Sequence, residues 1–265
     1  NIIKKLMEKK EKLSTLAQGL KILGSFSESQ SIHTISSIAK IHSISRSSAR
    51  RYLLTLNEEG YLKFDGKKFS LSAKILDYAY NFLSINNITT VITPYLKELT
   101  SRTNEPCGVA TLDGTEIKYV AWNNYNSVWP FRMNLEIGAK LPAFCTSMGR
   151  VLLSLLDDDD LELLFKSINM HPFTKHTQTK LNTLKDNISF ADKNGFSIMH
   201  QELVIGMTSV AVPINNKSSP SSLALNLSLE YEKYSDQHIV NELVPEMKHI
   251  ASKISEDIKL HKPIN

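Results

Sequence analysis

Cysteine is scarce in this chain of 265 residues, and long apolar runs are missing from it. Only Cys107 and Cys145 occur, without Cys-x-x-Cys spacing, which argues against a disulfide framework or a zinc site built on cysteine. No run approaches the roughly 20 apolar residues that span a bilayer, and residues 1–10 lack the apolar core of a signal peptide. Because the chain begins at Asn1 rather than at a methionine, we expect further residues before it. These absences predict a cytoplasmic protein without a membrane partner.

The composition is that of an ordinary globular protein, with 42% hydrophobic and 22% charged residues. A length well above the usual domain of ~100–150 residues favours two domains. The net charge of +4 is unevenly distributed: residues 1–75 hold 14 basic and 6 acidic side chains, a charge of +8. The remainder holds 17 basic and 21 acidic side chains, a charge of −4. A basic head on a mildly acidic body is expected when only the head meets a polyanion, either nucleic acid or an anionic membrane surface.

The first 73 residues predict helices followed by a hairpin. Helices are expected at residues 2–12, from Leu16 to the polar stretch 25–31, at 34–41 and at 46–59. Thr34 and Ser45 are suitable N-caps for the last two, and Gly60 stands where a glycine ends a helix. Asp65-Gly66 between two short extended runs is a strong hairpin signal. Helices, hairpin and charge together predict a winged helix-turn-helix DNA-binding domain over residues 1–73, with double-stranded DNA as its partner.

The helix at 46–59 separates an apolar face from a basic one. At about 100° per residue, Ala49, Tyr52, Leu53 and Leu56 fall on the face that packs inward. Hydroxyls and arginines lie opposite, and such groups fit a major groove because hydroxyls hold phosphates and arginine forks onto guanine. An ordinary solvated face is the alternative, but three arginines with no acid before Glu58 argue against it. The predicted DNA-binding residues, including the hairpin lysines, are Arg46, Ser47, Ser48, Arg50, Arg51, Thr55, Lys63, Lys67 and Lys68.

Residues 74–89 predict a linker helix, and residues 90–265 alternate strands and helices. The expected elements are a helix opened by Pro94 over 95–102, a hairpin around Asp113-Gly114, helices at 148–155 and 158–167, strands at 210–214 and 223–230, and a closing helix at 235–260. The acidic run at 157–160 suits the first turn of a helix through the helix dipole, without any ligand. The body is therefore predicted to be α+β, a sheet flanked by helices.

Several motifs in this order resemble one family. Residues 45–61 are similar to the recognition helix and following strand of the IclR family of bacterial transcriptional regulators. Residues 141–153 resemble the signature of that family's effector-binding domain, and are most similar to the subgroup that controls protocatechuate and 4-hydroxybenzoate catabolism. The segments 104–107, 112–114 and 206–214 fit the same pattern, so the resemblance covers about residues 14–260. It implies a winged-helix domain, a linker helix and a GAF-like α/β domain that binds a small organic acid. It also implies homodimers, often paired into tetramers.

The resemblance also implies an effector site in residues 90–265. The start of the helix near Ser147 would offer backbone N–H groups, a ready site for a carboxylate. Asn226 and Ser228 lie two apart on one strand and so face the same side of the sheet. The predicted effector-binding residues are Thr146, Ser147, Met148, Gly149, Met199, Met207, Ser209, Asn226 and Ser228.

The chain departs from the family pattern at three places. Met199 stands where some relatives carry an acid, which favours a larger or more apolar ligand, and Asn226 replaces a frequent hydroxyl. The segment 122–132 is unusually aromatic, so Trp122, Tyr125 and Trp129 could stack on an aromatic ligand or pack a subunit interface. Within it, Arg132 could pair with a ligand carboxylate or lie solvated at the surface.

An enzyme, or a sensor that does not bind DNA, is the main alternative to a regulator. Cys145 could suggest a nucleophile, and His171, His176 and His200 offer bases. The chain has no Gly-x-Ser-x-Gly or His-Glu-x-x-His motif, and the histidines follow no metal template. A head that binds protein or RNA is a second alternative, but RNA-recognition modules usually show exposed aromatics on a sheet, which the head lacks. We therefore expect a DNA-binding transcriptional regulator that responds to a small acidic metabolite, with an aromatic acid as one candidate. No catalytic residue, metal or cofactor is expected.

Overall fold

The structure is a computed structural model, and it describes residues 13–27, 29–85, 88–124, 135–214 and 222–260. The chain divides into two compact units, Asn1–Phe82 and Leu83–Asn265, here called the first unit and the second unit. The division falls inside the predicted linker helix at 74–89. The predicted basic helix at 2–12 lies outside the described residues. Among the described helices, none has the length and apolar character needed to cross a bilayer.

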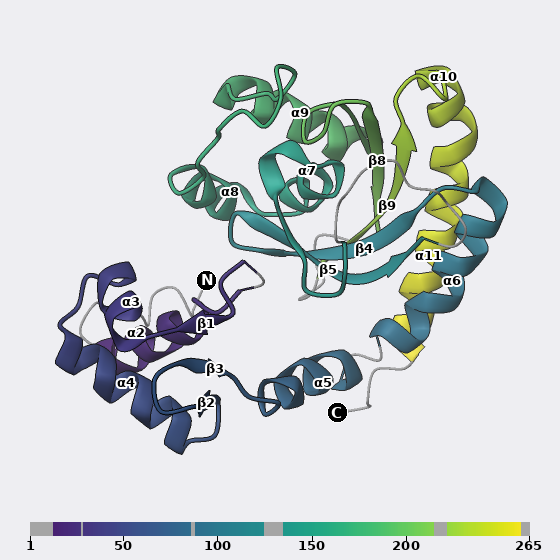
Figure 1. Cartoon of the computed structure of the whole chain (residues 1–265). Helices are drawn as coiled ribbons and strands as arrows, with labels where there is room; N and C mark the ends of the chain where they lie inside the picture. The colour runs from purple at the N-terminus through teal and green to yellow at the C-terminus, as the bar shows by residue number, and fades with distance from the viewer. Residues whose placement is uncertain (1–12, 28, 86–87, 125–134, 215–221, 261–265) are drawn as a thin grey trace. The chain divides into compact units, whose positions relative to one another are not determined.

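The first unit has the predicted order of helices and hairpin (Figure 1). Its elements are α2 (Ser14–Leu23), β1 (Ile32–His33), α3 (Ile35–Ile41), α4 (Arg46–Glu58), β2 (Leu62–Phe64), β3 (Phe69–Leu71) and the start of α5 (Ile75–Ile85). Thr34 caps α3 by accepting from Ser37 N–H, and Ser45 caps α4 by accepting from Ser48 N–H. Gly60 adopts φ +80° just after α4, as predicted for a residue that ends a helix. These features confirm the winged helix-turn-helix.

One strand of this unit was not predicted. β1 has only two residues and pairs antiparallel with β3, which gives a three-stranded sheet in the order β1-β3-β2. A strand this short carries too few residues to show an alternating pattern. His33 in β1 is buried, and its two ring nitrogens lie within hydrogen-bond distance of Ser25 O and Ser37 Oγ. The strand therefore ties the end of α2 to the start of α3.

The core of the first unit forms where the projection of α4 placed it. Ala49 and Leu53 are fully buried, and Tyr52 and Leu56 are half-buried against the same cluster. The other members of this cluster are Ile22, Phe26, Ile38, Ala39, Leu62 and Phe69. The predicted apolar face of α4 is therefore confirmed, and the opposite face is left at the surface.

The second unit is built on one antiparallel sheet of six strands in the order β6-β5-β4-β9-β8-β7. Its strands are β4 (Cys107–Asp113), β5 (Glu116–Asn123), β6 (Lys140–Pro142), β7 (Ser197–His200), β8 (Met207–Pro213) and β9 (Leu223–Glu230). Its helices are α6 (Ile88–Thr103), α7 (Ser147–Ser154), α8 (Asp158–Phe165), α9 (Leu181–Asn194), α10 (Asp236–His238) and α11 (Val244–Leu260), with a 3-10 turn at Ala143–Cys145 and a π-helical turn at Ile239–Leu243. The predicted α+β architecture is confirmed.

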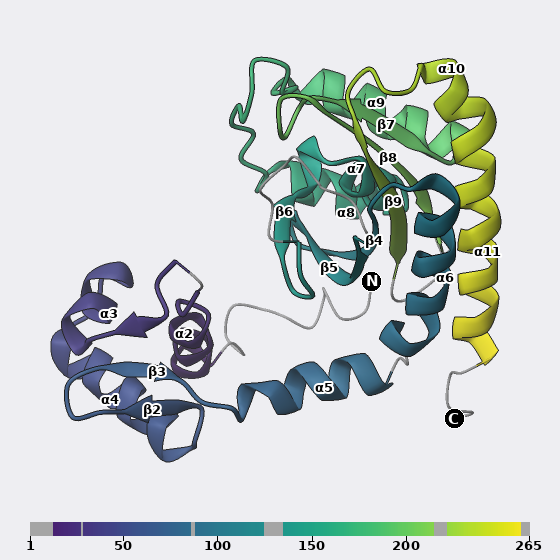
Figure 2. The ribbon, with the colours of Figure 1, turned by 45° about the vertical axis from the view of Figure 1, so that its right-hand side comes forward.

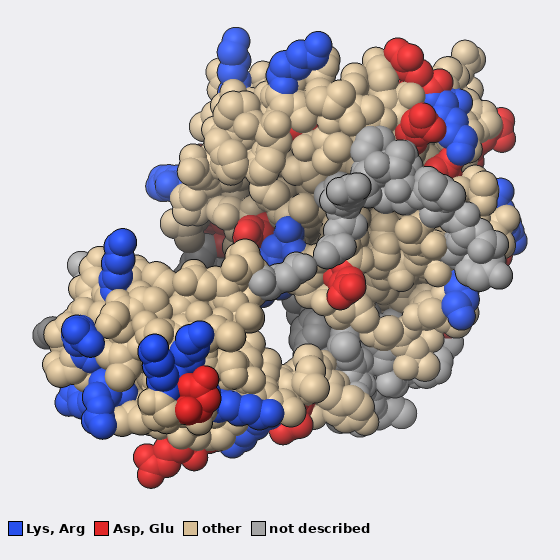
Figure 3. Space-filling model, in the orientation of Figure 1, with Lys and Arg blue, Asp and Glu red and all other residues tan. Residues whose placement is uncertain are grey.

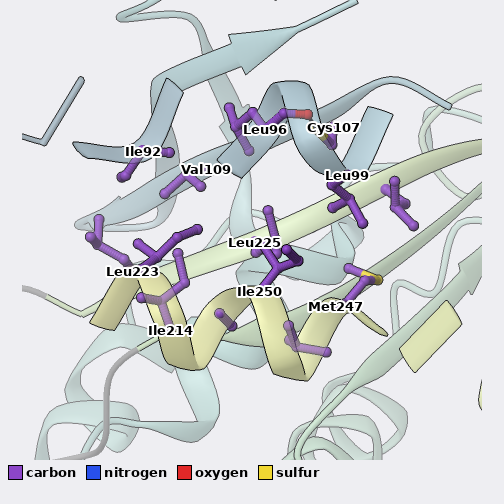
Figure 4. Packing of buried hydrophobic residues seen from close by; sticks show 14 of the residues in the cluster. Ile92, Leu96, Leu99, Cys107, Val109, Ile214, Leu223, Leu225, Met247 and Ile250 are labelled. Atoms are coloured by element: carbon purple, nitrogen blue, oxygen red, sulfur yellow. Dashed lines mark hydrogen bonds between the residues drawn. The ribbon is translucent and has the colours of Figure 1, made fainter. Parts of the chain in front are cut away.

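The two faces of this sheet carry different helices and different cores. α6 and α11 lie side by side on one face (Figures 1 and 2), where Ile92, Leu96 and Ile250 pack against strand residues such as Leu225 (Figure 4). α7 packs on the opposite face with α9 beside it. The second core, under α7, is the one that surrounds the predicted effector site.

Two elements of the second unit differ from the prediction. Pro94 was expected to open a helix, but α6 begins at Ile88 and contains Pro94 in its interior. The preceding turn stays helical because Val91 and Ile92 are buried in the core and Thr93 Oγ1 donates to Thr89 O. Burial therefore outweighs the hydrogen bond that proline cannot donate. The closing helix is interrupted by the π-helical turn at Ile239–Leu243, while α9, β6 and β7 were not predicted at all.

Candidate functional site

The basic face of α4 is exposed, as its sequence predicts. Arg46, Ser47, Arg50, Arg51 and Thr55 are all exposed. Ser48 is half-buried because Ser45 Oγ, the cap of the helix, donates to Ser48 Oγ at 2.9 Å. Lysine and arginine side chains gather on one face of the first unit (Figure 3). The N-terminal half of α4 thus presents cationic forks together with hydroxyls, the combination that contacts DNA bases and phosphates.

The turn of the hairpin β2–β3 is stabilised by the side chain of Asp65. Asp65 Oδ1 accepts hydrogen bonds from the backbone N–H groups of Lys67 at 2.9 Å and Lys68 at 2.7 Å, and these bonds lower the pKa of Asp65. Gly66 supplies the turn with φ +96°. Lys63, Lys67 and Lys68 are exposed, so this wing presents three cations to solvent. The carboxylate of Asp65 is hydrogen-bonded to the backbone of the turn.

Arg51 and Thr55 have a second environment that the sequence did not indicate. Both border an apolar groove of about 1260 Å³ on the first unit, between α2, α4 and the start of α5. Its apolar lining consists of Leu13, Leu16, Leu20, Leu23, Tyr52, Leu56, Tyr61, Ile75 and Tyr78. Leu16 is 59% exposed and Leu20 is 60% exposed. The basic face of α4 therefore adjoins an apolar surface that is exposed among the described residues.

The predicted effector residues meet in the second unit, under α7. Eight of the nine line one cavity of about 20 Å³, namely Thr146, Ser147, Met148, Met199, Met207, Ser209, Asn226 and Ser228. Four lining residues were not predicted: Tyr119, Leu135, Leu141 and Leu203. A cavity of this size holds about one water molecule. An organic acid would therefore need the lining to move outward.

The start of α7 provides the polar end of this cavity. Thr146 caps the helix: its Oγ1 accepts from Gly149 N–H at 3.2 Å, and its carbonyl accepts from Arg150 N–H at 3.1 Å. A helix leaves its first N–H groups without intrahelical partners, and Ser147 and Met148, the first two residues of α7, both line the cavity. Ser147 Oγ lies 2.6 Å from Ser209 Oγ and ties α7 to β8.

Gly149 differs from the other predicted effector residues. It lies outside the cavity lining, and its N–H is used by Thr146. A Cβ at this position would lie 2.0 Å from Ala143 O. The glycine therefore allows α7 to pack directly on the backbone of the 3-10 turn, and the geometry supports a packing role rather than contact with a ligand.

Tyr119 lies on the cavity side of β5 by the ordinary alternation of a strand, as Ile117 does, and the pairing of β4 with β5 skips the next residue. Val109 pairs with Ala121 and Ala110 with Tyr119, which leaves Val120 as a bulge. Such a bulge redirects the neighbouring side chains: Val120 and Ala121 both belong to the core on the other face, and Trp122 returns to the side of Tyr119. The ring of Tyr119 meets that of Trp122 edge to face at 5.6 Å, and burial raises the pKa of Tyr119. Trp122 thus packs on Tyr119 and does not line the cavity, while Tyr125, Trp129 and Arg132 lie outside the described residues.

A buried ion pair supports the cavity from behind, and sequence reasoning missed it. Arg150 of α7 is 3% exposed in its side chain and Glu202 is 8% exposed. Arg150 Nη2 donates to both carboxylate oxygens of Glu202 at 2.9 Å, and Arg150 Nε donates to Phe144 O. Gln178 N–H also donates to Glu202 at 2.9 Å. Since Leu203 lines the cavity, this pair fixes the segment that closes it.

The residues considered for catalysis do not form a reactive site. Cys145 is buried, and burial raises the pKa of its thiol to about 12, so it stays a neutral, unreactive group. Cys107 behaves in the same way. His171 packs on Phe173, whereas His200 pairs with Asp236 at 3.1 Å. Within the described ranges, no three His, Cys, Asp or Glu side chains come together as metal ligands.

Comparison with known proteins identifies the family. The model of the IclR helix-turn-helix domain matches residues 15–66, and that of the bacterial transcriptional regulator IclR C-terminal domain matches residues 80–256. The Pca regulon regulatory protein of Pseudomonas putida is 31% identical, over 88% of this chain and 80% of its own length.

Solved structures agree with this result. A putative transcriptional regulator from Rhodococcus is 32% identical with a TM-score of 0.73, covering 94% of this chain and 99% of its own. An IclR homologue from Microbacterium hydrocarbonoxydans, solved in complex with 4-hydroxybenzoate, shares the fold with a TM-score of 0.74 and 19% identity, covering 93% and 99%. The matched proteins are regulators rather than enzymes. The chain belongs to the IclR family of bacterial transcriptional regulators.

Proposed function

We propose that this regulator binds operator DNA through α4 and the β2–β3 wing, and that a small aromatic carboxylic acid bound under α7 alters that binding. The observation that carries the proposal is the cavity in which Thr146, Ser147, Met148, Ser209 and Asn226 meet. It combines helix N–H groups for a carboxylate with an apolar wall for a ring. The Microbacterium homologue with bound 4-hydroxybenzoate supports the aromatic class.

On DNA, α4 is the recognition helix. Its exposed arginines, Arg46, Arg50 and Arg51, enter the major groove, and the wing lysines contact phosphates beside it. The segregation of charge supports this division of labour, since the acidic side of the balance lies in the second unit. The effector can change DNA binding only if it binds the conformation that binds DNA and the conformation that does not with unequal affinity.

A second copy of the chain covers the groove on the first unit. A monomer rarely leaves a contiguous apolar surface of this kind uncovered, and Leu13, Leu16 and Leu20 present one on α2 and at its start. Dimers formed there would carry two copies of α4 to two half-sites of one operator. Pairing of such dimers gives the tetramers expected for the family.

The effector site is tested by filling it. Ser209 is buried at the cavity, and a tryptophan in its place leaves no room for an acid. In wild type, an acid at 100 times its Kd should raise the Tm by roughly 5–10 °C, whereas Ser209→Trp should show no shift. Differential scanning fluorimetry against aromatic acids, their ring-cleavage products and short keto-acids measures this.

The matched control is Ser167→Trp, at an exposed serine just past α8, which should keep the full shift. Circular dichroism checks that Ser209→Trp is folded. If the variant unfolds, Ser209→Leu makes the same test with a smaller side chain. A folded Ser209 variant that is stabilised as strongly as wild type would place the effector elsewhere.

A further inference from the structure

One residue that lines the cavity under α7 carries a buried acceptor without a partner among the described residues. Asn226 is 2% exposed, and its Nδ2 donates to Ser228 Oγ at 3.1 Å. Its Oδ1 is buried and has no hydrogen-bond partner among the described residues, and Asn226 is one of the residues that line the cavity. Buried polar oxygens are nearly always paired, so an unpaired one at a ligand site points to a donor that the ligand brings.

The two residues that pair with Asn226 on the neighbouring strands have no side chain that could donate a hydrogen bond to its Oδ1. Asn226 lies directly opposite Gly108 of β4 and Ala211 of β8. The Thr146 hydroxyl is directed to Pro142 O at 3.0 Å, and Ser147 and Ser209 lie within hydrogen-bond distance of each other. None of the described hydroxyls, those of Tyr119 and Ser228 included, forms a hydrogen bond with Asn226 Oδ1.

Gly108 lets two aromatic rings pack closely on the strand next to Asn226. A Cβ on Gly108 would lie 2.9 Å from Tyr119 Cε1 and 2.7 Å from Trp122 Cε3. Without a Cβ, the Tyr119 ring leans over the backbone of Gly108, next to the strand that carries Asn226. Tyr119 and Asn226 both line the cavity, which therefore combines an aromatic ring with the residue that carries the unpaired acceptor.

We propose that Asn226 Oδ1 accepts a hydrogen bond from a hydroxyl group of the effector, so that the site selects hydroxy-substituted acids over the same acids without the hydroxyl. This inference rests on the proposed effector site. The two polar ends of the site then bind different groups of the effector: the N–H groups of Ser147 and Met148 bind the carboxylate, and Asn226 Oδ1 accepts from the hydroxyl. A neutral carbonyl suits the second task because it accepts from a hydroxyl but gains nothing from a C–H group.

The selectivity is expected to be large, since a site built around a hydroxyl is left with an unpaired buried group when the hydroxyl is missing. We expect 3-hydroxybenzoate or 4-hydroxybenzoate to bind the full chain at least about 10-fold more tightly than benzoate. In Asn226→Leu, which keeps the side-chain size and removes the carbonyl, this preference should fall to within about 3-fold. Isothermal titration calorimetry of each variant with the three acids measures both ratios.

The chain offers a matched control. Asn123 lies in the same sheet, outside the cavity lining, and its Nδ2 donates to Thr100 Oγ1 at 2.9 Å. Asn123→Leu makes the same chemical change and should keep the wild-type preference. If Asn226→Leu fails to fold, Asn226→Ala removes the carbonyl with a smaller side chain and the same expected loss.

Each outcome decides one statement. Equal binding of benzoate and both hydroxybenzoates by wild type overturns the inference while leaving the proposed site intact, provided that Ser209→Trp abolishes their binding. A preference that survives in Asn226→Leu and disappears in Tyr119→Phe also overturns it, because the Tyr119 hydroxyl would then be the reader. Absence of binding by all three acids contradicts the aromatic-acid proposal itself, and the inference with it.

Discussion

Replacing Glu202 by glutamine will lower the free energy of unfolding of the second unit by about 3–5 kcal/mol. The change leaves the Arg150 guanidinium, 3% exposed, without its counter-charge in the core under α7. Removing one partner of a buried pair costs this much because the remaining charge stays desolvated. Urea unfolding followed by tryptophan fluorescence measures the loss selectively, since both tryptophans, Trp122 and Trp129, belong to the second unit.

An exposed pair in the same unit is the control. Glu116 lies 3.6 Å from Lys140, with both side chains about half exposed, and Glu116→Gln should cost no more than about 1 kcal/mol. The double variant Arg150→Met/Glu202→Leu should recover most of the loss, because apolar side chains of similar size replace a buried pair at little cost. If Glu202→Gln were as mild as Glu116→Gln, the pair would not support the cavity.

Replacing both Arg50 and Arg51 by alanine will weaken binding to operator DNA by about 2–6 kcal/mol, since each arginine fork to a base contributes about 1–3 kcal/mol. Both side chains are exposed on α4, and no acid follows before Glu58. Fluorescence anisotropy with a duplex selected by the wild-type chain from a random pool gives the two affinities.

The control for the Arg50/Arg51 double variant removes two positive charges from the second unit instead. Lys175 and Lys180 are exposed in the second unit, so Lys175→Ala/Lys180→Ala should bind the duplex almost as wild type does. The single variants add a finer test, because Arg51 borders the apolar groove whereas Arg50 is not among its lining residues. Full affinity in the Arg50/Arg51 double variant would remove α4 from the DNA interface.

Local signals were sufficient to predict the described helices and the hairpin of the first unit, though not the two-residue strand β1. Thr34, Ser45, Gly60 and the Asp65-Gly66 turn act within a few residues of their own positions, and the structure places each as its chemistry requires. The groove on this unit could not be predicted in the same way. It is formed by residues from Leu13 to Tyr78, and their proximity depends on how α2, α4 and α5 pack.

The cavity shows the same limit. Motif resemblance led to Ser147, Ser209 and Asn226, which carry recognisable polar chemistry, and all three line it. It missed Tyr119, which lies in none of the matched motifs, and Leu203, which follows Glu202 of the buried pair. Strand register and a pairing between residues 52 positions apart leave no periodic trace in the sequence.

The most direct test of the account is whether an acid bound in the cavity changes DNA binding. The full chain should select, from a random duplex pool, an inverted repeat whose half-sites lie about one or more helical turns apart. Saturating hydroxybenzoate should change the Kd for that duplex by at least about 5-fold, and Ser209→Trp should abolish the change. A chain that selects no sequence, or whose affinity is the same with the cavity filled and empty, would contradict the account.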